Sequence, residues 1–83
     1  MANTSLTTQV SFYHIPVDNT RLLSVRAGVG TDNALSVADA LYGAVKFHIG
    51  QAIQKGMDSD TAYLCEFAME AAFALRSAAG VAA

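Results

Sequence analysis

His48, Cys65 and Glu66 are the residues whose types could carry out chemistry. An imidazole, a thiol and a carboxylate are the groups of a nucleophilic catalyst, in which a base activates the thiol. However, no loop for an oxyanion hole is evident, and two helices offer little concavity. Cysteine is also among the most buried residue types. We therefore expect packing roles and a non-enzymatic protein, and keep a small enzyme using Cys65 and His48 as a remote alternative.

The element that positions His48 is a long helix predicted over residues 32–55. Thr31 or Asp32 is a suitable N-cap, and Lys55 followed by Gly56 is typical of a helix end. Apolar residues follow helical spacing in between, which indicates an unusually wide apolar face. They form two adjacent stripes, the first of Leu35, Ala38, Tyr42, Val45, Ile49, Ala52 and Ile53, and the second of Val37, Leu41, Ala44 and His48.

Cys65 and Glu66 belong to a second helix, predicted over residues 58–79 and capped by Asp58 or Ser59. A turn near Gly56 and Met57 brings the two helices together antiparallel. Large residues of the first helix then face alanines of the second, so the pair can approach closely. In this register Val45 faces Ala68, Leu41 faces Ala72, Ala38 faces Leu75 and His48 lies near Cys65.

The N-terminal third of the chain lacks helical spacing. Residues 1–8 are small and polar, and we expect them to be loose. Residues 9–29 contain two extended candidates, 9–15 and 21–29, separated by a turn, and these favour a short β-hairpin. The glycines of "VRAGVG" do not form a dinucleotide fingerprint, because position 33 is asparagine.

Size and composition favour association. The chain has 83 residues, of which 53% are hydrophobic and 14% charged, and a single cysteine excludes an internal disulfide. A domain this small usually needs a further source of stability. We predict one mainly α domain over residues 1–83, an extended segment or hairpin followed by a helical hairpin, which dimerises into a four-helix bundle. The candidate dimer or partner interface consists of Val37, Leu41, Ala44, His48, Phe67, Met69 and Phe73.

Charge and sequence pattern argue against several other classes. The net charge of −2 provides no basic stripe, so nucleic acid is not an expected partner. Glu66, Glu70 and Arg76 interrupt the best candidate for a membrane span, and no signal-peptide pattern is present. The histidines and the cysteine lack metal-ligand spacing, and no cofactor motif occurs. A cytoplasmic protein without metal or cofactor is expected.

A resemblance covers residues 21–79. The apolar-x-Val segment with its glycine turn continues into a helix with Ala34, Leu35, Ala38 and Leu41, followed by a second alanine-rich helix. The turn pattern consists of Leu23, Val25, Gly28 and Val29. This arrangement resembles a family of short, uncharacterised bacterial proteins of the pseudomonad type with a domain of unknown function. The resemblance implies a small, helical, non-secreted protein and no particular site residues.

Two non-enzymatic functions are compatible with these features. The first is a homodimeric protein-interaction or regulatory module with an unidentified protein partner. The second is a ribbon-helix-helix-like DNA-binding transcriptional regulator, because strand, helix and helix in a dimer is that architecture. The acidic chain and the length of both helices favour the first.

Overall fold

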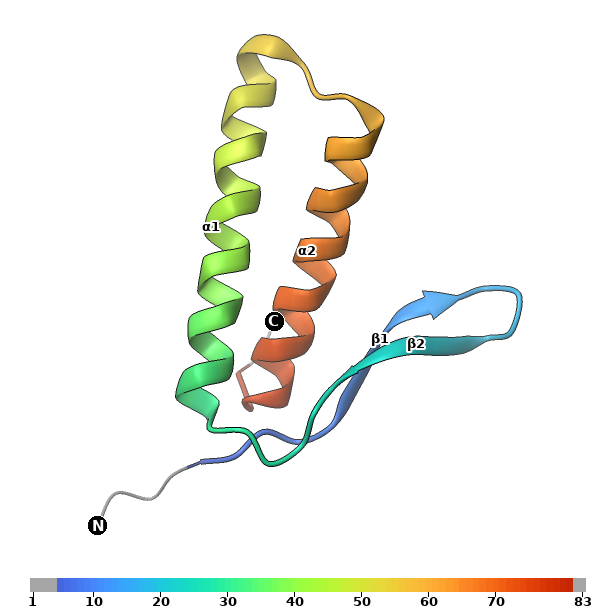
Figure 1. The fold of residues 1–83 in the computed structure, drawn as a ribbon, viewed down its shortest axis with the longest axis vertical. Coiled ribbons are helices and arrows are strands. Elements are labelled where there is room, and N and C mark those ends of the chain that lie inside the picture. The colour runs from blue at the N-terminus through green and yellow to red at the C-terminus, as the bar shows by residue number, and fades with distance from the viewer. Residues whose placement is uncertain (1–4, 82–83) are drawn as a thin grey trace.

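The computed structural model describes residues 5–81 as a β-hairpin followed by a helical hairpin (Figure 1). The elements are β1 (Val10–Ile15), β2 (Thr20–Val25), α1 (Thr31–Lys55) and α2 (Ser59–Ala78). This confirms the predicted mainly α fold, and of the two forms predicted for the N-terminal segment it shows the β-hairpin.

The hairpin pairs its two strands antiparallel within one chain, with Val10 opposite Val25 and Ile15 opposite Thr20. A four-residue turn connects them, and Asn19 there adopts a positive φ of 54°, which asparagine tolerates better than most residues. His14 Nε2 lies 3.1 Å from Asn19 Oδ1 across the turn. The second strand ends at Val25, earlier than the predicted extended segment 21–29.

Residues 5–8 explain why the second strand ends early, and they correct the expectation of a loose N-terminus. Thr7 is buried, and its hydroxyl donates to the Arg26 carbonyl (2.7 Å) and accepts from the Val29 amide (3.0 Å). The Thr7 backbone also donates to Val29 O and accepts from Gly28 N. The loop after β2 therefore bonds to the N-terminal segment instead of extending the strand. Residues 1–4 of the expected loose segment lie outside the described residues.

We expect Thr7→Val to destabilise the protein by about 1–3 kcal/mol, because valine keeps the shape of threonine but leaves the Val29 amide without its acceptor. Urea unfolding at a fixed protein concentration measures the change. Thr8→Val is the matched control, since Thr8 is exposed and bonds to Ala78 only through its backbone amide. Equal unfolding midpoints for the two variants would show that the Thr7 hydroxyl contributes little.

The helix ends follow the sequence signals with one exception. Gly30, rather than Thr31 or Asp32, precedes α1, and no side chain caps it. The helix starts earlier because the Gly30 carbonyl already accepts the amides of Asn33 and Ala34. Gly56, at φ 76°, ends α1 as expected.

The second helix is capped by Asp58, whose Oδ1 accepts the Thr61 amide at 2.7 Å. This bond lowers the pKa of the Asp58 carboxyl from its ordinary value. The helix ends at Ala78, and Gly80 beyond it has a φ of 84°. Both features agree with the predicted boundaries to within about one residue.

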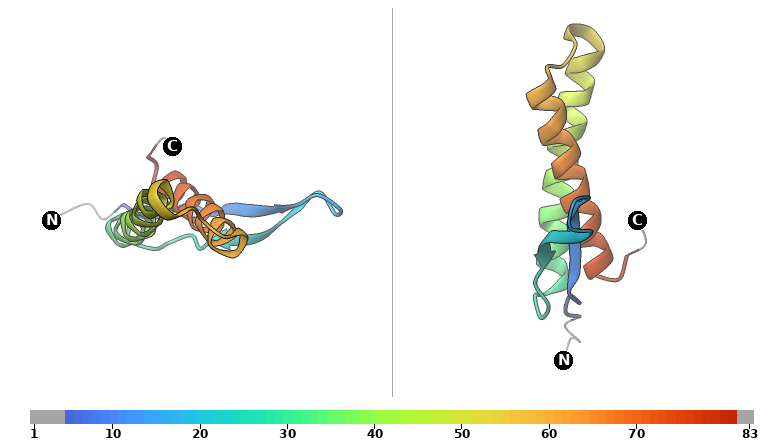
Figure 2. Two further views of the ribbon diagram at one scale, coloured as in Figure 1. Left: turned by 90° about the horizontal axis from the view of Figure 1, so that it is seen from above. Right: turned by 90° about the vertical axis from the view of Figure 1, so that its right-hand side faces the viewer.

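The elements lie side by side in one layer (Figure 2). Between residues 5 and 81 the strands contact α2 and not α1, so α2 lies between α1 and the hairpin. The molecule measures 49 × 35 × 16 Å. A single helix with its side chains is about 10–12 Å across, so the shortest dimension holds only one layer. Most domains bury their apolar faces between two layers, and this chain by itself does not.

Small residues form most of the core. The buried apolar residues are Val25, Ala34, Ala38, Val45, Ala72, Ala74 and Ala78. Ala74 and Ala78 of α2 pack against Val25 at the end of β2. Ala72 lies on the side of α2 toward α1. These alanines allow close approach, but they bury little area, which leaves the larger apolar side chains outside.

Candidate functional site

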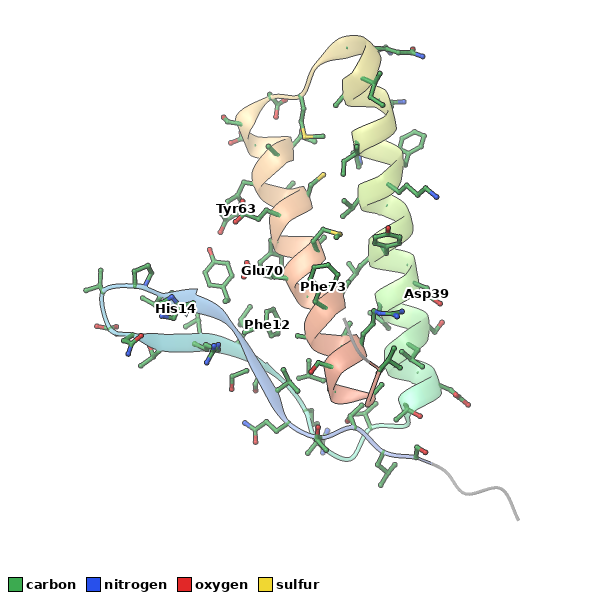
Figure 3. The ribbon with its side chains drawn as sticks, turned by 180° about the vertical axis from the view of Figure 1, so that it is seen from behind. Phe12, His14, Asp39, Tyr63, Glu70 and Phe73 are labelled. Carbon is green, nitrogen blue, oxygen red and sulfur yellow. The ribbon has the colours of Figure 1, made fainter. Side chains whose placement is uncertain are left out.

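Four large apolar side chains form what we call the outer apolar face: Tyr42, Ile49 and Ile53 of α1 and Phe73 of α2. Their exposed fractions are 52%, 51%, 83% and 44%. Intervals of seven and four residues place the three α1 side chains on one side of the helix. Tyr42 and Phe73 line one groove of about 320 Å³, together with Ala38, Asp39, Ala72 and Arg76. In Figure 3, Phe73 and Asp39 mark this region on the two helices.

Tyr42, Ile49 and Ile53 belong to the first of the two predicted stripes, which also contains Ala38 and Val45, yet all three are exposed. The buried residues of α1 are Ala34, Ala38 and Val45 instead. The apolar face of α1 is wider than a single neighbouring helix covers, so its flank stays exposed. Of the predicted first stripe, Ala38 and Val45 are buried and Leu35 and Ala52 half-buried, so only part of the stripe is packed.

The predicted interface residues separate into three groups. Val37, Ala44 and His48 are exposed and Leu41 is half-buried, on a side of α1 away from Tyr42. Phe73 is exposed and Met69 half-buried on α2. Phe67 instead contacts the hairpin, with its ring centroid 6.4 Å from that of Phe12 and 5.5 Å from that of Tyr13. Phe67 therefore lies in an internal contact.

The candidate catalytic pair is not joined in this structure. His48 is exposed and lines a shallow pocket with Lys55 and Thr61 that does not include Cys65. Cys65 is half-buried, and among residues 5–81 no hydrogen bond involves either side chain.

A second groove, which we call the aromatic groove, lies between α2 and the end of β1. It has a volume of about 360 Å³ and combines aromatic rings with carboxylates. In Figure 3, Tyr63 and Glu70 of α2 lie on the side of the helix toward His14 and Phe12 of β1. The lining residues are Tyr13, His14, Ile15, Pro16, Tyr63, Glu66, Phe67 and Glu70.

Tyr13 lines this groove and has an unusual backbone. Its φ is 64°, in the left-handed region that a bulky residue rarely adopts, and it interrupts the regular pairing of the strands. Its ring meets that of Phe67 edge to face at 64°, and its hydroxyl bonds to the hydroxyl of Tyr63. Backbone strain in a folded protein persists only where surrounding contacts support it, and these two contacts provide that support.

The electrostatic environment of the groove is negative. The hydrogen bond to Tyr63 is the largest cause that raises the pKa of Tyr13, followed by desolvation and the Tyr63 charge, and then by the charges of Glu70 and Glu66. Neither carboxylate takes part in a side-chain hydrogen bond within residues 5–81. Glu66 and Glu70 therefore contribute negative charge to the groove, and no side-chain hydrogen bond within residues 5–81 offsets it.

Other kinds of site find no support in the described part of the chain. Residues 5–81 contain no group of three or more His, Cys, Asp or Glu side chains that could hold a metal ion. Over the same residues, neither helix combines the length and apolar character that crossing a membrane requires. The family resemblance drawn from the sequence stays a prediction. No protein-family model, curated protein or solved structure matches this chain.

Proposed function

We propose that this chain is a small homodimeric helical protein that acts as a protein-interaction or regulatory module, with the outer apolar face as the dimer contact. The observation that supports this most directly is the single layer, 16 Å thick, with Tyr42, Ile49, Ile53 and Phe73 open to solvent. A second copy laid against this face completes the missing layer and gives a four-helix bundle.

The accessible surface area supports an interface of this size. The whole chain, including its six terminal residues, exposes 5990 Å². A globular monomer of 8.7 kDa exposes about 4,700 Å². The excess is about 1,300 Å², whereas a stable standard interface buries about 800 Å² on each partner. One dimer contact of standard size therefore covers about 800 Å² of this excess on each copy.

The outer apolar face also suits a second copy of the same chain. A twofold interface needs a surface that is complementary to itself. Asp39 on α1 and Arg76 on α2 border the apolar residues and have opposite charges. A twofold axis in the plane of this face, parallel to the helices and between them, would place α1 of one copy over α2 of the other and so bring Asp39 toward the partner's Arg76. Val37 and Leu64, exposed at 52% and 63%, stay outside this contact and are available to a protein partner.

The DNA-binding alternative gains no support from the hairpin. Its two strands pair within one chain, so no second chain is needed to complete a ribbon. Of the five basic residues, only Arg21 lies in a strand.

Sedimentation equilibrium of the full chain tests the proposal. At micromolar concentrations we expect twice the mass of the 8.7 kDa chain, because burial of the four side chains outweighs the entropy lost on association. A monomer at hundreds of micromolar would overturn the dimer and would leave the outer apolar face without an occupant.

A further inference from the structure

We propose that the aromatic groove between α2 and β1 is a binding site for an organic cation of the quaternary ammonium class. The site uses none of the residues of the outer apolar face, so it goes beyond the dimer and does not depend on it. Four observations carry the proposal: the aromatic rings, the two carboxylates, the hydroxyl pair and the volume.

The aromatic rings provide the first requirement. Tyr13, Tyr63 and Phe67 line the groove. The rings of Tyr13 and Phe67 are arranged edge to face, with an interplanar angle of 64° and centroids 5.5 Å apart. The face of an aromatic ring attracts a cation through its quadrupole, and several rings around one site are the usual means of holding a methylated ammonium group. Tyr63 is 56% exposed, although it points toward the hairpin, so its ring is accessible to a ligand.

The carboxylates provide the second requirement. Glu66 and Glu70 are four residues apart on α2, which places them on one side of the helix, and both line the groove. No lysine or arginine belongs to the lining residues. Arg21 pairs with His14 across the hairpin and lines the neighbouring groove with Glu70, and His14 Nε2 is within hydrogen-bond distance of Asn19. The charge of the groove is therefore complementary to a cation.

The hydroxyl pair and the volume select the class of cation. The hydroxyls of Tyr13 and Tyr63 bond to each other, so the polar ends of the aromatic wall are already satisfied. A quaternary ammonium has no N–H donors and needs no hydrogen-bond acceptor, in contrast to a guanidinium. The volume of about 360 Å³ lies at the small end of ligand sites, which suits one such headgroup.

An NMR titration of the full chain with choline tests this site, and 3,3-dimethylbutan-1-ol is the neutral control of equal shape. We expect saturable shifts of the amides of residues 13–16 and 63–70, with a Kd on the order of 1 mM, which is typical of a weak small-ligand site. The neutral alcohol should bind about two- to fivefold more weakly, as the loss of one exposed cation–π contact predicts. Equal binding of the alcohol would show a merely apolar groove and would overturn the proposal.

Variants distinguish the groove from the rest of the surface. Glu66→Gln with Glu70→Gln, and separately Tyr63→Leu, should each weaken choline binding by about two- to fivefold or more. Asp32→Asn and Phe47→Leu are the controls, because both residues are exposed on α1 and neither lines the aromatic groove or belongs to the outer apolar face. Unchanged binding by both groove variants, or shifts that map outside the groove, would overturn the site while leaving the dimer proposal untouched.

Two sources could supply the same headgroup, and a further comparison separates them. A short peptide with one trimethyllysine is titrated beside choline and beside the same peptide with unmodified lysine. Tighter binding of the trimethyllysine peptide than of choline assigns the site to a methylated protein, and tighter binding of choline assigns it to a free small molecule. Binding of neither would contradict the proposal.

Discussion

Tyr42→Glu combined with Ile49→Glu should convert the dimer into a folded monomer. Burying each of these side chains contributes about 1.5–3 kcal/mol, so losing two from each copy raises the dimer Kd by at least about two orders of magnitude. Glutamate is a better helix former than either residue, so α1 itself should not be weakened. Sedimentation equilibrium measures the mass, and circular dichroism checks that the helices remain.

Val37→Glu is the matched control for this experiment. Val37 is exposed at 52%, as Tyr42 is, but lies on another side of α1. We expect this variant to stay dimeric. The opposite pattern, a monomeric Val37→Glu and a dimeric double variant, would assign the dimer contact to the side of α1 that contains Val37, Ala44 and His48.

The helical part of the fold could be predicted because its signals are local. Periodic apolar residues, the Asp58 cap and Gly56 each act within a few positions of the chain, and both helices begin and end within about one residue of the predicted bounds. The hairpin was predictable for the same reason, since residues 16–19 form a turn between two β-branched and aromatic runs. These are the cases where local preference and the final fold agree.

Thr7 shows the limit of local reasoning. Nothing in "MANTSLTT" distinguishes Thr7 from its neighbours, yet its hydroxyl joins Arg26 and Val29, about twenty residues away. The early end of β2 follows from this long-range contact. A segment of small polar residues predicts disorder on average, and only the position of its partners shows which threonine is buried.

The aromatic groove was missed for a related reason. Phe67 was predicted as an interface residue, because the sequence could not show that the hairpin covers that side of α2. Its contact with Tyr13 joins positions far apart in the chain, and the positive φ of Tyr13 is atypical of an aromatic residue in a strand. The available signal was Glu66 and Glu70 on one side of a helix that also carries Tyr63 and Phe67.

Ala72→Leu should destabilise the protein by about 1–3 kcal/mol, which is typical of added bulk at a packed site. Ala72 is 1% exposed on the side of α2 toward α1, near the buried Ala38, so a longer side chain must push the helices apart. Leucine is nearly as good a helix former as alanine, so intrinsic propensity does not account for such a loss. For a domain of this size the melting temperature should fall by roughly 4–8 °C for each kcal/mol.

Ala62→Leu on the same helix is the control, because it makes the same substitution at a position outside the packed contact between the helices. Ala62 is exposed, so the same added atoms enter solvent and the melting temperature should change little. Both variants are compared with wild type at one protein concentration, because the stability of a dimer depends on it. If the Ala72→Leu variant had the same melting temperature as the wild type, the alanines would not determine the distance between the helices. The large apolar side chains would then be exposed for a reason other than the close approach of α1 and α2.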